Sequence, residues 1–237
     1  MSKRQILRER RRRRQRRQRL VIIAMVVVVA LLVAFALIYP SVKPVGDIIM
    51  ITPRANNAPV EMNTMGDPGA PVLVEVWEDF HCGGCKYYSE TIEPLIIQNY
   101  VETGKALYVF RHFPFLASES YQAASASMCA GEQGRFWDYH DMLFANAGEQ
   151  DAFGDNRLIA YAKALDLNVA DFRQCLGDDR YAEQINLDKE ELDARGSAAA
   201  PAIFVNSQPV YSSTNPERGI PTYEDIARAI ETALAGQ

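Results

Sequence analysis

The N-terminal part of the chain contains twenty apolar residues in a row, 20–39, without a charged side chain. A helix rises about 1.5 Å per residue, so this run is long enough to span roughly the 30 Å hydrocarbon core of a bilayer. The pattern therefore predicts a transmembrane helix. Small residues at Ala34 and Ala36 leave a cleaved signal peptide as the alternative, but the run continues to Tyr39 and has the length of an anchor.

Downstream of this run, alternating and helical patterns predict an α/β domain. Branched apolar residues alternate with others over 72–77 and predict a strand, which is followed by a helix at 86–103 and a second strand at 106–113. Pro94 is expected to interrupt or kink that helix. The order is that of a βαβ unit with a right-handed crossover.

Residues 118–195 carry helical patterns throughout, including a helix for which Asp155 or Asn156 is the expected cap. The α/β pattern then resumes with a strand at 202–205, a short returning strand at 209–211 and a final helix that Thr222 caps. This helical block therefore resembles an insertion into an α/β frame.

Composition and charge divide the chain further. Hydrophobic residues make up 48% and charged residues 23%, which excludes a disordered or low-complexity protein. The net charge of −5 combines +10 over residues 1–19 with −15 over residues 40–237. Basic residues beside a first transmembrane helix stay on the cytoplasmic side, so the basic run predicts a cytoplasmic N-terminus and an exported body rather than nucleic-acid binding.

These patterns predict four segments. They are a basic cytoplasmic tail (1–19), a transmembrane helix (20–39), a proline-containing linker (40–66) and a single domain (67–237) with a helical insertion at about 117–196. The expected location is the cell membrane, with a single pass and an extracytoplasmic domain. Disulfides persist in that compartment.

Two of the four cysteines, Cys82 and Cys85, are separated by two glycines where the first strand gives way to the first helix. The unpaired N–H groups and the positive dipole end of a helix N-terminus lower the pKa of a thiol placed there. His81 and Lys86 are candidate modulators because they add positive character nearby. Cys82 is therefore the expected nucleophile and Cys85 the resolving thiol of a disulfide exchange reaction.

The sequence resembles the DsbA-like thiol-disulfide oxidoreductases of the thioredoxin superfamily over residues 68–237. The resemblance rests on four segments: VEVWEDFHCGGCK, TGKALYVFRHFPF, CAGEQGRFWDYHDMLF and APAIFVN. It implies a thioredoxin fold with a helical insertion. It also implies a cis-proline at Pro201, preceded by Ala200, that faces the redox pair and shapes a groove for substrate.

The sequence departs from the family pattern at two places. Gly83 and Gly84 replace the proline and the histidine or aromatic residue that usually separate the cysteines. The acid often found six residues before the first cysteine is Val76 here, which leaves Glu75 and Glu78 as candidates for a buried proton carrier.

The other two cysteines, Cys129 and Cys175, are expected to form a structural disulfide within the insertion, because an even number of thiols in an exported protein usually pairs. A second redox relay is the alternative. A zinc site formed by the four cysteines with His81 or His112 is not favoured, because Cys129 and Cys175 share no short ligand spacing. No metal and no cofactor is therefore expected.

The favoured function is that of a membrane-anchored enzyme that introduces disulfides into reduced or unfolded exported proteins. By family analogy, a quinone-linked membrane oxidase would reoxidise the pair. Two alternatives remain open: a reductase or isomerase that a membrane partner keeps reduced, and a surface-anchored binding domain without exchange chemistry.

Overall fold

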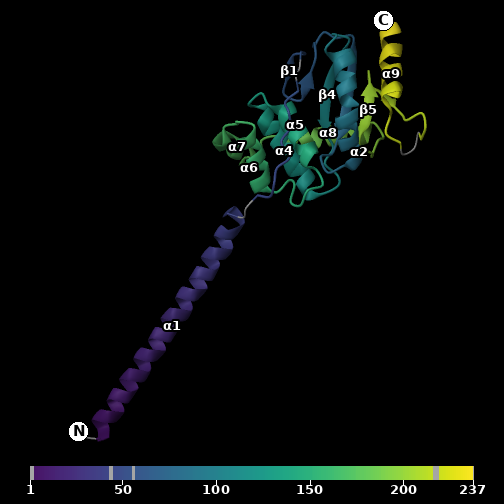
Figure 1. The fold of residues 1–237 in the computed structure, drawn as a ribbon. Coiled ribbons are helices and arrows are strands. Elements are labelled where there is room, and N and C mark those ends of the chain that lie inside the picture. The colour runs from purple at the N-terminus through teal and green to yellow at the C-terminus, as the bar shows by residue number, and fades with distance from the viewer. Residues whose placement is uncertain (1–2, 43–44, 55–56, 216–218, 237) are drawn as a thin grey trace. The chain divides into compact units, whose positions relative to one another are not determined.

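The computed structural model describes residues 3–42, 45–54, 57–215 and 219–236, which fall into two units, residues 1–44 and 45–237. The first unit contains one helix, α1 (Lys3–Val42), drawn in Figure 1 as a continuous coil. Within it, the stretch Arg13–Leu37 is long and apolar enough to cross a membrane, with a mean hydropathy of 3.4. The predicted span 20–39 lies inside α1, and the basic run continues the same helix.

The second unit is built on a six-stranded sheet with the order β1-β2-β4-β3-β5-β6. Its central strand β3 pairs in parallel with β4, as the βαβ prediction requires, and antiparallel with β5. All residues of β3 except Leu73 are buried, including Glu75 and Glu78, as expected for a central strand covered on both faces. The strands are β1 (Val60–Glu61), β2 (Thr64–Met65), β3 (Val72–Glu78), β4 (Ala106–His112), β5 (Ala202–Val205) and β6 (Gln208–Val210).

The helix predicted for 86–103 begins three residues earlier and consists of three pieces. They are α2 (Gly83–Thr91), α3 (Glu93–Ile96) and a π-helical turn, η1 (Ile97–Val101). The break falls at Ile92, two residues before Pro94, because proline has no N–H for the helical ladder and its ring crowds the preceding turn. Gly104, at a φ of +72°, ends the segment.

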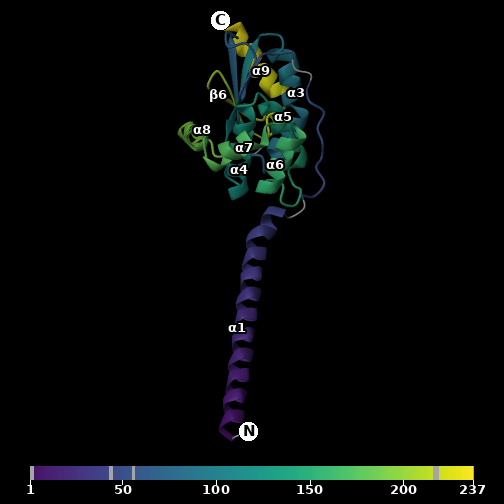
Figure 2. The ribbon, with the colours of Figure 1, turned by 90° about the vertical axis from the view of Figure 1, so that its left-hand side faces the viewer.

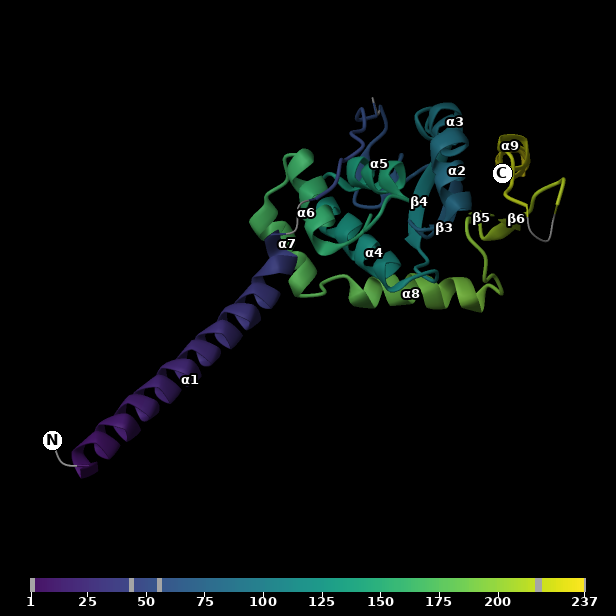
Figure 3. The same ribbon diagram turned by 60° about the horizontal axis from the view of Figure 1, so that its bottom comes forward.

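Five helices form the insertion. Four of them, α4 to α7, gather beside the β4 side of the sheet, and α8 runs past β4 toward β5, where its Leu192 packs on the sheet, whereas α9 (Tyr223–Ala235) lies beside β5 and β6 (Figure 3). The expected side-chain cap at Asp155 or Asn156 is wrong, because the chain enters α6 one residue earlier, at Gly154. The predicted capping box of α9, between Thr222 and Asp225, is present. The insertion helices are α4 (Ser118–Gly131), α5 (Phe136–Asn146), α6 (Asp155–Ala164), α7 (Val169–Gly177) and α8 (Ala182–Ala194).

Residues 45–54 and 57–66, expected to be part of a linker, pack on the domain instead. We call residues 45–54 the strap; Figure 2 shows it in dark blue as an extended segment along the domain. Its backbone at Ile49 exchanges two 2.9 Å hydrogen bonds with the side chain of Asn146. Residues 60–65 then form β1 and β2, and β2 pairs with β4. An extended segment buries isolated apolar residues such as Ile48 and Ile51 without showing a helical or strand period in the sequence.

Candidate functional site

The two cysteines of the C-G-G-C segment lie at the N-terminus of α2, directly after the central strand β3. Cys82 is the N-cap residue of α2, and its Sγ accepts a 3.3 Å hydrogen bond from the backbone N–H of Cys85. Cys82 is partly exposed, whereas Cys85 is fully buried in the core. The same short segment therefore places one sulfur within reach of another protein and hides the other.

The surroundings of the two sulfurs shift their pKa values in opposite directions. Hydrogen bonds from the Cys85 thiol and from the N–H groups of Cys85 and Gly84 lower the pKa of Cys82 to about 6, against the opposing effect of burial. Burial, followed by the hydrogen bond to Cys82 and the charge of Glu78, raises the pKa of Cys85 above that of an ordinary thiol. At neutral pH the pair therefore offers one thiolate, on Cys82, and one thiol.

The loop before β5 faces the pair from the other side. The peptide bond between Ala200 and Pro201 is cis. Sγ of Cys82 lies 3.4 Å from the carbonyl oxygen of Ala200, to which the protonated form of Cys82 donates a hydrogen bond. Pro201 and Ile220 line a groove of about 240 Å³. A Cβ added to Gly84 would lie 3.1 Å from the Ile220 side chain and 3.5 Å from that of Pro201. The groove therefore lies next to the reactive sulfur.

The two candidate acids have different surroundings. Glu75 forms 3.0 Å ion pairs with Arg111 and Arg195, which assigns it to a network of charges on the sheet. Glu78 is 1% exposed, and neither of its carboxyl oxygens has a hydrogen-bond partner among the described residues. Burial and then the charge of Glu93 raise the pKa of Glu78 well above its ordinary value. Of the two acids, Glu78 is the one coupled to the cysteines.

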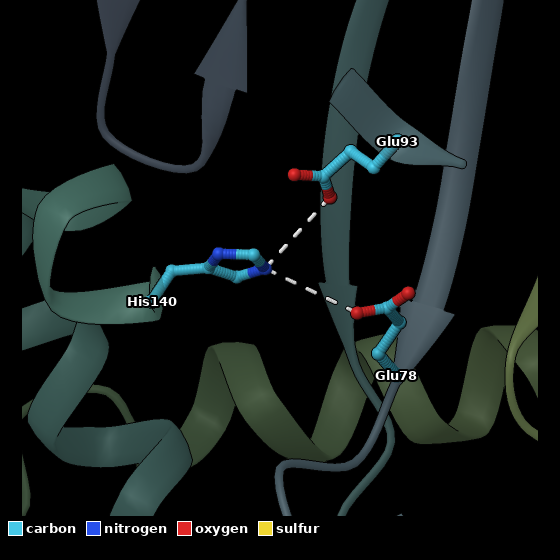
Figure 4. Close-up of side chains that lie close together, drawn as sticks. All are labelled: Glu78, Glu93 and His140. Atoms are coloured by element: carbon cyan, nitrogen blue, oxygen red, sulfur yellow. Dashed lines mark ion pairs between the residues drawn. The ribbon is translucent and has the colours of Figure 1, made fainter. Parts of the chain in front are cut away.

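Beneath the cysteine pair, three fully buried side chains meet from three different elements (Figure 4). Glu78 ends β3, Glu93 begins α3, and the ring of His140 from α5 points between their carboxyl groups. The Nε2 atom of His140 lies 4.0 Å from Oε2 of Glu78 and 3.8 Å from Oε2 of Glu93. Arg54 of the strap forms ion pairs with Glu93 and with Asp141.

The whole domain is related to known redox proteins. Residues 58–232 match the family described as Thioredoxin. The chain belongs to the thioredoxin family. Within it, the chain resembles the DsbA-like thiol-disulfide oxidoreductases, whose solved members share its fold. The crystal structure of oxidised BdbD from Bacillus subtilis superposes with a TM-score of 0.65 at 24% identity, covering 81% of this chain and 100% of that one. For Chlamydia trachomatis DsbA the TM-score is 0.63 at 22% identity, covering 82% and 99%.

Two sequence relatives support this resemblance. Disulfide bond formation protein D of Bacillus subtilis is 26% identical over 196 residues, covering 81% of this chain and 83% of that protein. Na(+)/H(+) antiporter NhaA 1 of Salinispora arenicola is 34% identical over 173 residues, covering 72% of this chain. The chain spans only 24% of the antiporter's length, so this match relates this DsbA-like domain to one part of a larger protein.

The two basic candidates beside the cysteines of this DsbA-like protein are both held by neighbouring groups. The ring of His81 packs edge-on against Phe153, with 4.5 Å between the ring centroids. The ammonium group of Lys86 donates to the carbonyls of Ala145 and Ala147, at the C-terminal end of α5. Lys86 therefore ties α2 to the insertion, a contact that its position in the sequence did not indicate.

Cys129 and Cys175 form a disulfide bond that joins α4 to α7. Each cysteine is 1% exposed and lies in the hydrophobic core. His112, the other histidine considered for a zinc site, is fully buried among aromatic rings, and burial lowers its pKa to about 3. The four cysteines and His112 are thus divided among separate environments.

The cluster of Glu78, Glu93 and His140 has the donor types of a metal site, with its ligand atoms within 4.8 Å of one another. The guanidinium of Arg54, however, already pairs with Glu93, and the Tyr108 hydroxyl donates a 3.0 Å hydrogen bond to Oε2 of the same carboxylate. Because Glu93 is already neutralised and hydrogen-bonded, we do not assign these side chains as metal ligands.

Sequence reasoning did not bring Glu93, Arg54 and Asp141 to the site. Glu93 follows the break in the helix, and Arg54 lies in a segment expected to be a linker. For Glu93, the sequence did offer one signal: it is an acid next to Pro94 on a helix face that is otherwise apolar, which could have indicated a buried carboxylate. For Arg54 the sequence offered none, because its partners are 39 and 87 residues away.

Proposed function

We propose that this DsbA-like protein introduces disulfides into reduced or unfolded exported proteins through Cys82 and Cys85. In the oxidised enzyme, a substrate thiolate attacks Sγ of Cys82, and the electron pair of the broken S–S bond moves to Cys85. A second substrate thiolate then attacks the sulfur of the first substrate cysteine in the mixed disulfide. The substrate leaves with a disulfide, and both enzyme cysteines remain reduced.

The observation that carries this proposal is the contrast between the low pKa of Cys82 and the buried, high-pKa thiol of Cys85. A thiolate stabilised at Cys82 favours the reduced form, so the disulfide form readily takes electrons from a substrate. The pKa of Cys82 is lower in the folded, reduced chain than in the unfolded chain. Ionisation of Cys82 therefore stabilises the folded, reduced chain, and this stabilisation is complete above the pH at which a free thiol ionises. That stabilisation is lost as the pH falls through about 6. This favours an oxidase over a reductase.

The surrounding residues have supporting roles in this proposal. The cis peptide at Pro201 and the carbonyl of Ala200 hold the substrate backbone against Cys82, and the disulfide between Cys129 and Cys175 stabilises the insertion. Glu78 exchanges a proton with Cys85. His81, packed against Phe153, and Lys86, bound to the end of α5, help to position the segment that carries the pair.

The proposed location is the cell membrane, with the basic N-terminal residues in the cytoplasm and the redox domain outside. The apolar stretch of α1 and the positive-inside rule support this orientation. A reoxidising partner in the same membrane, by family analogy a quinone-linked oxidase, would accept the electrons.

The test uses the full-length chain in detergent. The reduction potential of its redox pair is titrated against glutathione, and oxidation of a reduced, unfolded protein is followed, with Cys82→Ser as the control. We expect a potential well above that of glutathione and activity that Cys82→Ser abolishes. A potential below that of glutathione would instead indicate a reductase, and a Cys82 with the reactivity of a free thiol would indicate a binding domain.

A further inference from the structure

The acid beneath the redox pair has no direct connection to solvent. Glu78 is 1% exposed and Cys85 is fully buried. The charge of Glu78 contributes to the raised pKa of Cys85, so the two groups are electrostatically coupled. Each turnover removes a proton from Cys85 and later returns one. A buried acid with no exchange route could pass a single proton back and forth but could not equilibrate it with water.

His140 lies between Glu78 and Asp141, a carboxylate that reaches the surface. Its Nε2 is 4.0 Å from Oε2 of Glu78, and its Nδ1 is 2.9 Å from Oδ1 of Asp141. The Asp141 side chain is 14% exposed, whereas the imidazole is completely buried. The distance between Nε2 of His140 and Oε2 of Glu78 exceeds a hydrogen bond by about 1 Å, a gap that a small rotation of the Glu78 side chain would close.

The other charged groups around His140 are fixed by neighbours. Arg54 of the strap pairs with Glu93 of α3 and with Asp141. Tyr108 of β4 donates to Glu93, and His112 of β4 acts on His140 electrostatically. Aromatic rings enclose the remaining faces of the imidazole; they belong to Phe80, Phe110, Phe136, Trp137 and Phe144. Among the groups described, the Nε2 of His140 and both oxygens of Glu78 lack a hydrogen-bond partner.

We propose that His140 is a positioning residue that relays protons between Glu78 and Asp141, so that the acid beside Cys85 exchanges protons with solvent during turnover. The proposal rests on the proposed function, because it concerns the protons of the same disulfide exchange. It assigns a role to His140 and Asp141, two consecutive residues of the insertion, in chemistry that occurs at the end of β3.

The relay is balanced over one catalytic cycle. The structure contains the reduced pair, in which we assign the proton of His140 to Nδ1, facing Asp141. Before reoxidation, Glu78 passes its proton to Nε2 while Nδ1 releases its own to Asp141 and water. The resulting Glu78 carboxylate takes the Cys85 proton. The Cys85 thiolate then attacks Cys82 in its mixed disulfide with the oxidising partner, and the partner's sulfur leaves with the electron pair.

Substrate oxidation reverses this movement. The substrate thiolate bonds to Cys82, the Cys82–Cys85 bond breaks, and the Cys85 thiolate takes the proton of Glu78. Nε2 of His140 then protonates Glu78, while Nδ1 receives a proton through Asp141 from water. One proton leaves and one returns in each cycle, so the imidazole alternates between its two tautomers and never has to rotate in its enclosed position.

The test measures rates in the full-length protein. Reoxidation of the reduced pair by oxidised glutathione and its reduction by dithiothreitol are followed across the neutral pH range. In His140→Phe we expect both rates to fall about tenfold or more and their pH dependence to change, with an unchanged reduction potential. His140→Gln is the second variant, because it keeps a polar group beside Asp141 but cannot relay a proton. Both slow rates together with the unchanged potential would support the relay.

The matched control is His112→Phe. His112 is equally buried in the same aromatic cluster, and neither of its ring nitrogens has a hydrogen-bond partner among the described residues. The reoxidation and reduction rates of His112→Phe should stay within about twofold of those of the wild-type protein. Wild-type rates in both His140 variants would overturn the relay, as would a stoichiometric metal ion that His140→Gln releases. If the wild-type chain itself exchanges no disulfides, the proposed function fails; if it does and the variants match it, only the relay fails.

Discussion

The two cysteine pairs of this protein differ in almost every physical respect except residue type. Cys82 is partly exposed at a helix N-terminus beside a cis peptide, and Cys85 lies beneath it. Cys129 and Cys175 are each 1% exposed and join two helices through a disulfide. Exchange chemistry needs an accessible, stabilised thiolate, and a structural bridge needs neither. Local environment, rather than the presence of cysteine, therefore separates the reactive pair from the supporting pair.

The largest expected effect comes from removing the resolving thiol. Cys85→Ser leaves Cys82 nucleophilic but with no thiol to release a trapped partner. Turnover should fall to the uncatalysed rate, and mixed disulfides at Cys82 should accumulate, visible on non-reducing gels after rapid alkylation. The double variant Cys129→Ser/Cys175→Ser should trap nothing. Equal trapping by both proteins would show that the second pair also takes part in exchange.

The converse experiment examines stability. Replacing both Cys129 and Cys175 with alanine removes a crosslink between residues 46 positions apart in the sequence. The unfolded chain then gains conformational entropy, so the free energy of unfolding should fall by about 4 kcal/mol. Denaturant unfolding of the oxidised proteins measures this difference. The rate of disulfide exchange should remain near that of wild type. A variant with wild-type stability but impaired exchange would reverse the roles assigned to the two pairs.

The strap is expected to stabilise the charges beneath the reactive pair. Arg54→Met would leave Glu93 buried without its cation, and we expect a loss of about 3 kcal/mol in unfolding free energy. The double variant Arg54→Met/Glu93→Gln should recover much of that loss. Arg180→Met is the matched control, because its ion pair with Glu132 is exposed and should contribute nothing measurable. Equal effects of the two arginine substitutions would contradict the assignment of Arg54.

The smallest expected effect distinguishes the two glycines between the reactive cysteines. A Cβ on Gly83 meets nothing within 4 Å, whereas one on Gly84 would lie 3.1 Å from Ile220. Gly83→Ala should leave turnover unchanged. Gly84→Ala should lower the oxidation rate of a protein substrate a few-fold by narrowing the groove beside Pro201, as steady-state kinetics would show. The opposite ranking would mean that substrate approaches from another side.

Much of the frame was predictable because its signals are local. The β-branched pattern of β3, the proline that interrupts the helical segment after β3, the glycine that ends this segment, and the capping box at Thr222 each involve neighbouring residues. The redox motif at Cys82 was likewise predictable, since a strand-to-helix junction places it at a helix N-terminus. Pro94 marked the helix break, although the π-helical turn after it left no clear pattern.

The buried acid cluster could not be predicted in the same way. It depends on contacts between the strap, β3, α3 and α5, and each charge alone resembles an ordinary surface residue in the sequence. Arg54 lies in a segment without hydrophobic period, because an extended chain packed on a domain needs only scattered apolar contacts. Glu75 and Glu78 were equivalent candidates in sequence, and only the ion pairs of Glu75 separated them.

The central claim is that Cys82 is an activated thiolate and Cys85 is not. Alkylation of the reduced full-length chain, followed against pH by mass spectrometry, tests it most directly. The modification rate of Cys82 should rise through a midpoint near pH 6 and stay high at neutral pH, while Cys85 remains unmodified throughout. A midpoint at the pH of a free thiol, or modification of Cys85 before Cys82, would contradict the proposed chemistry of the pair.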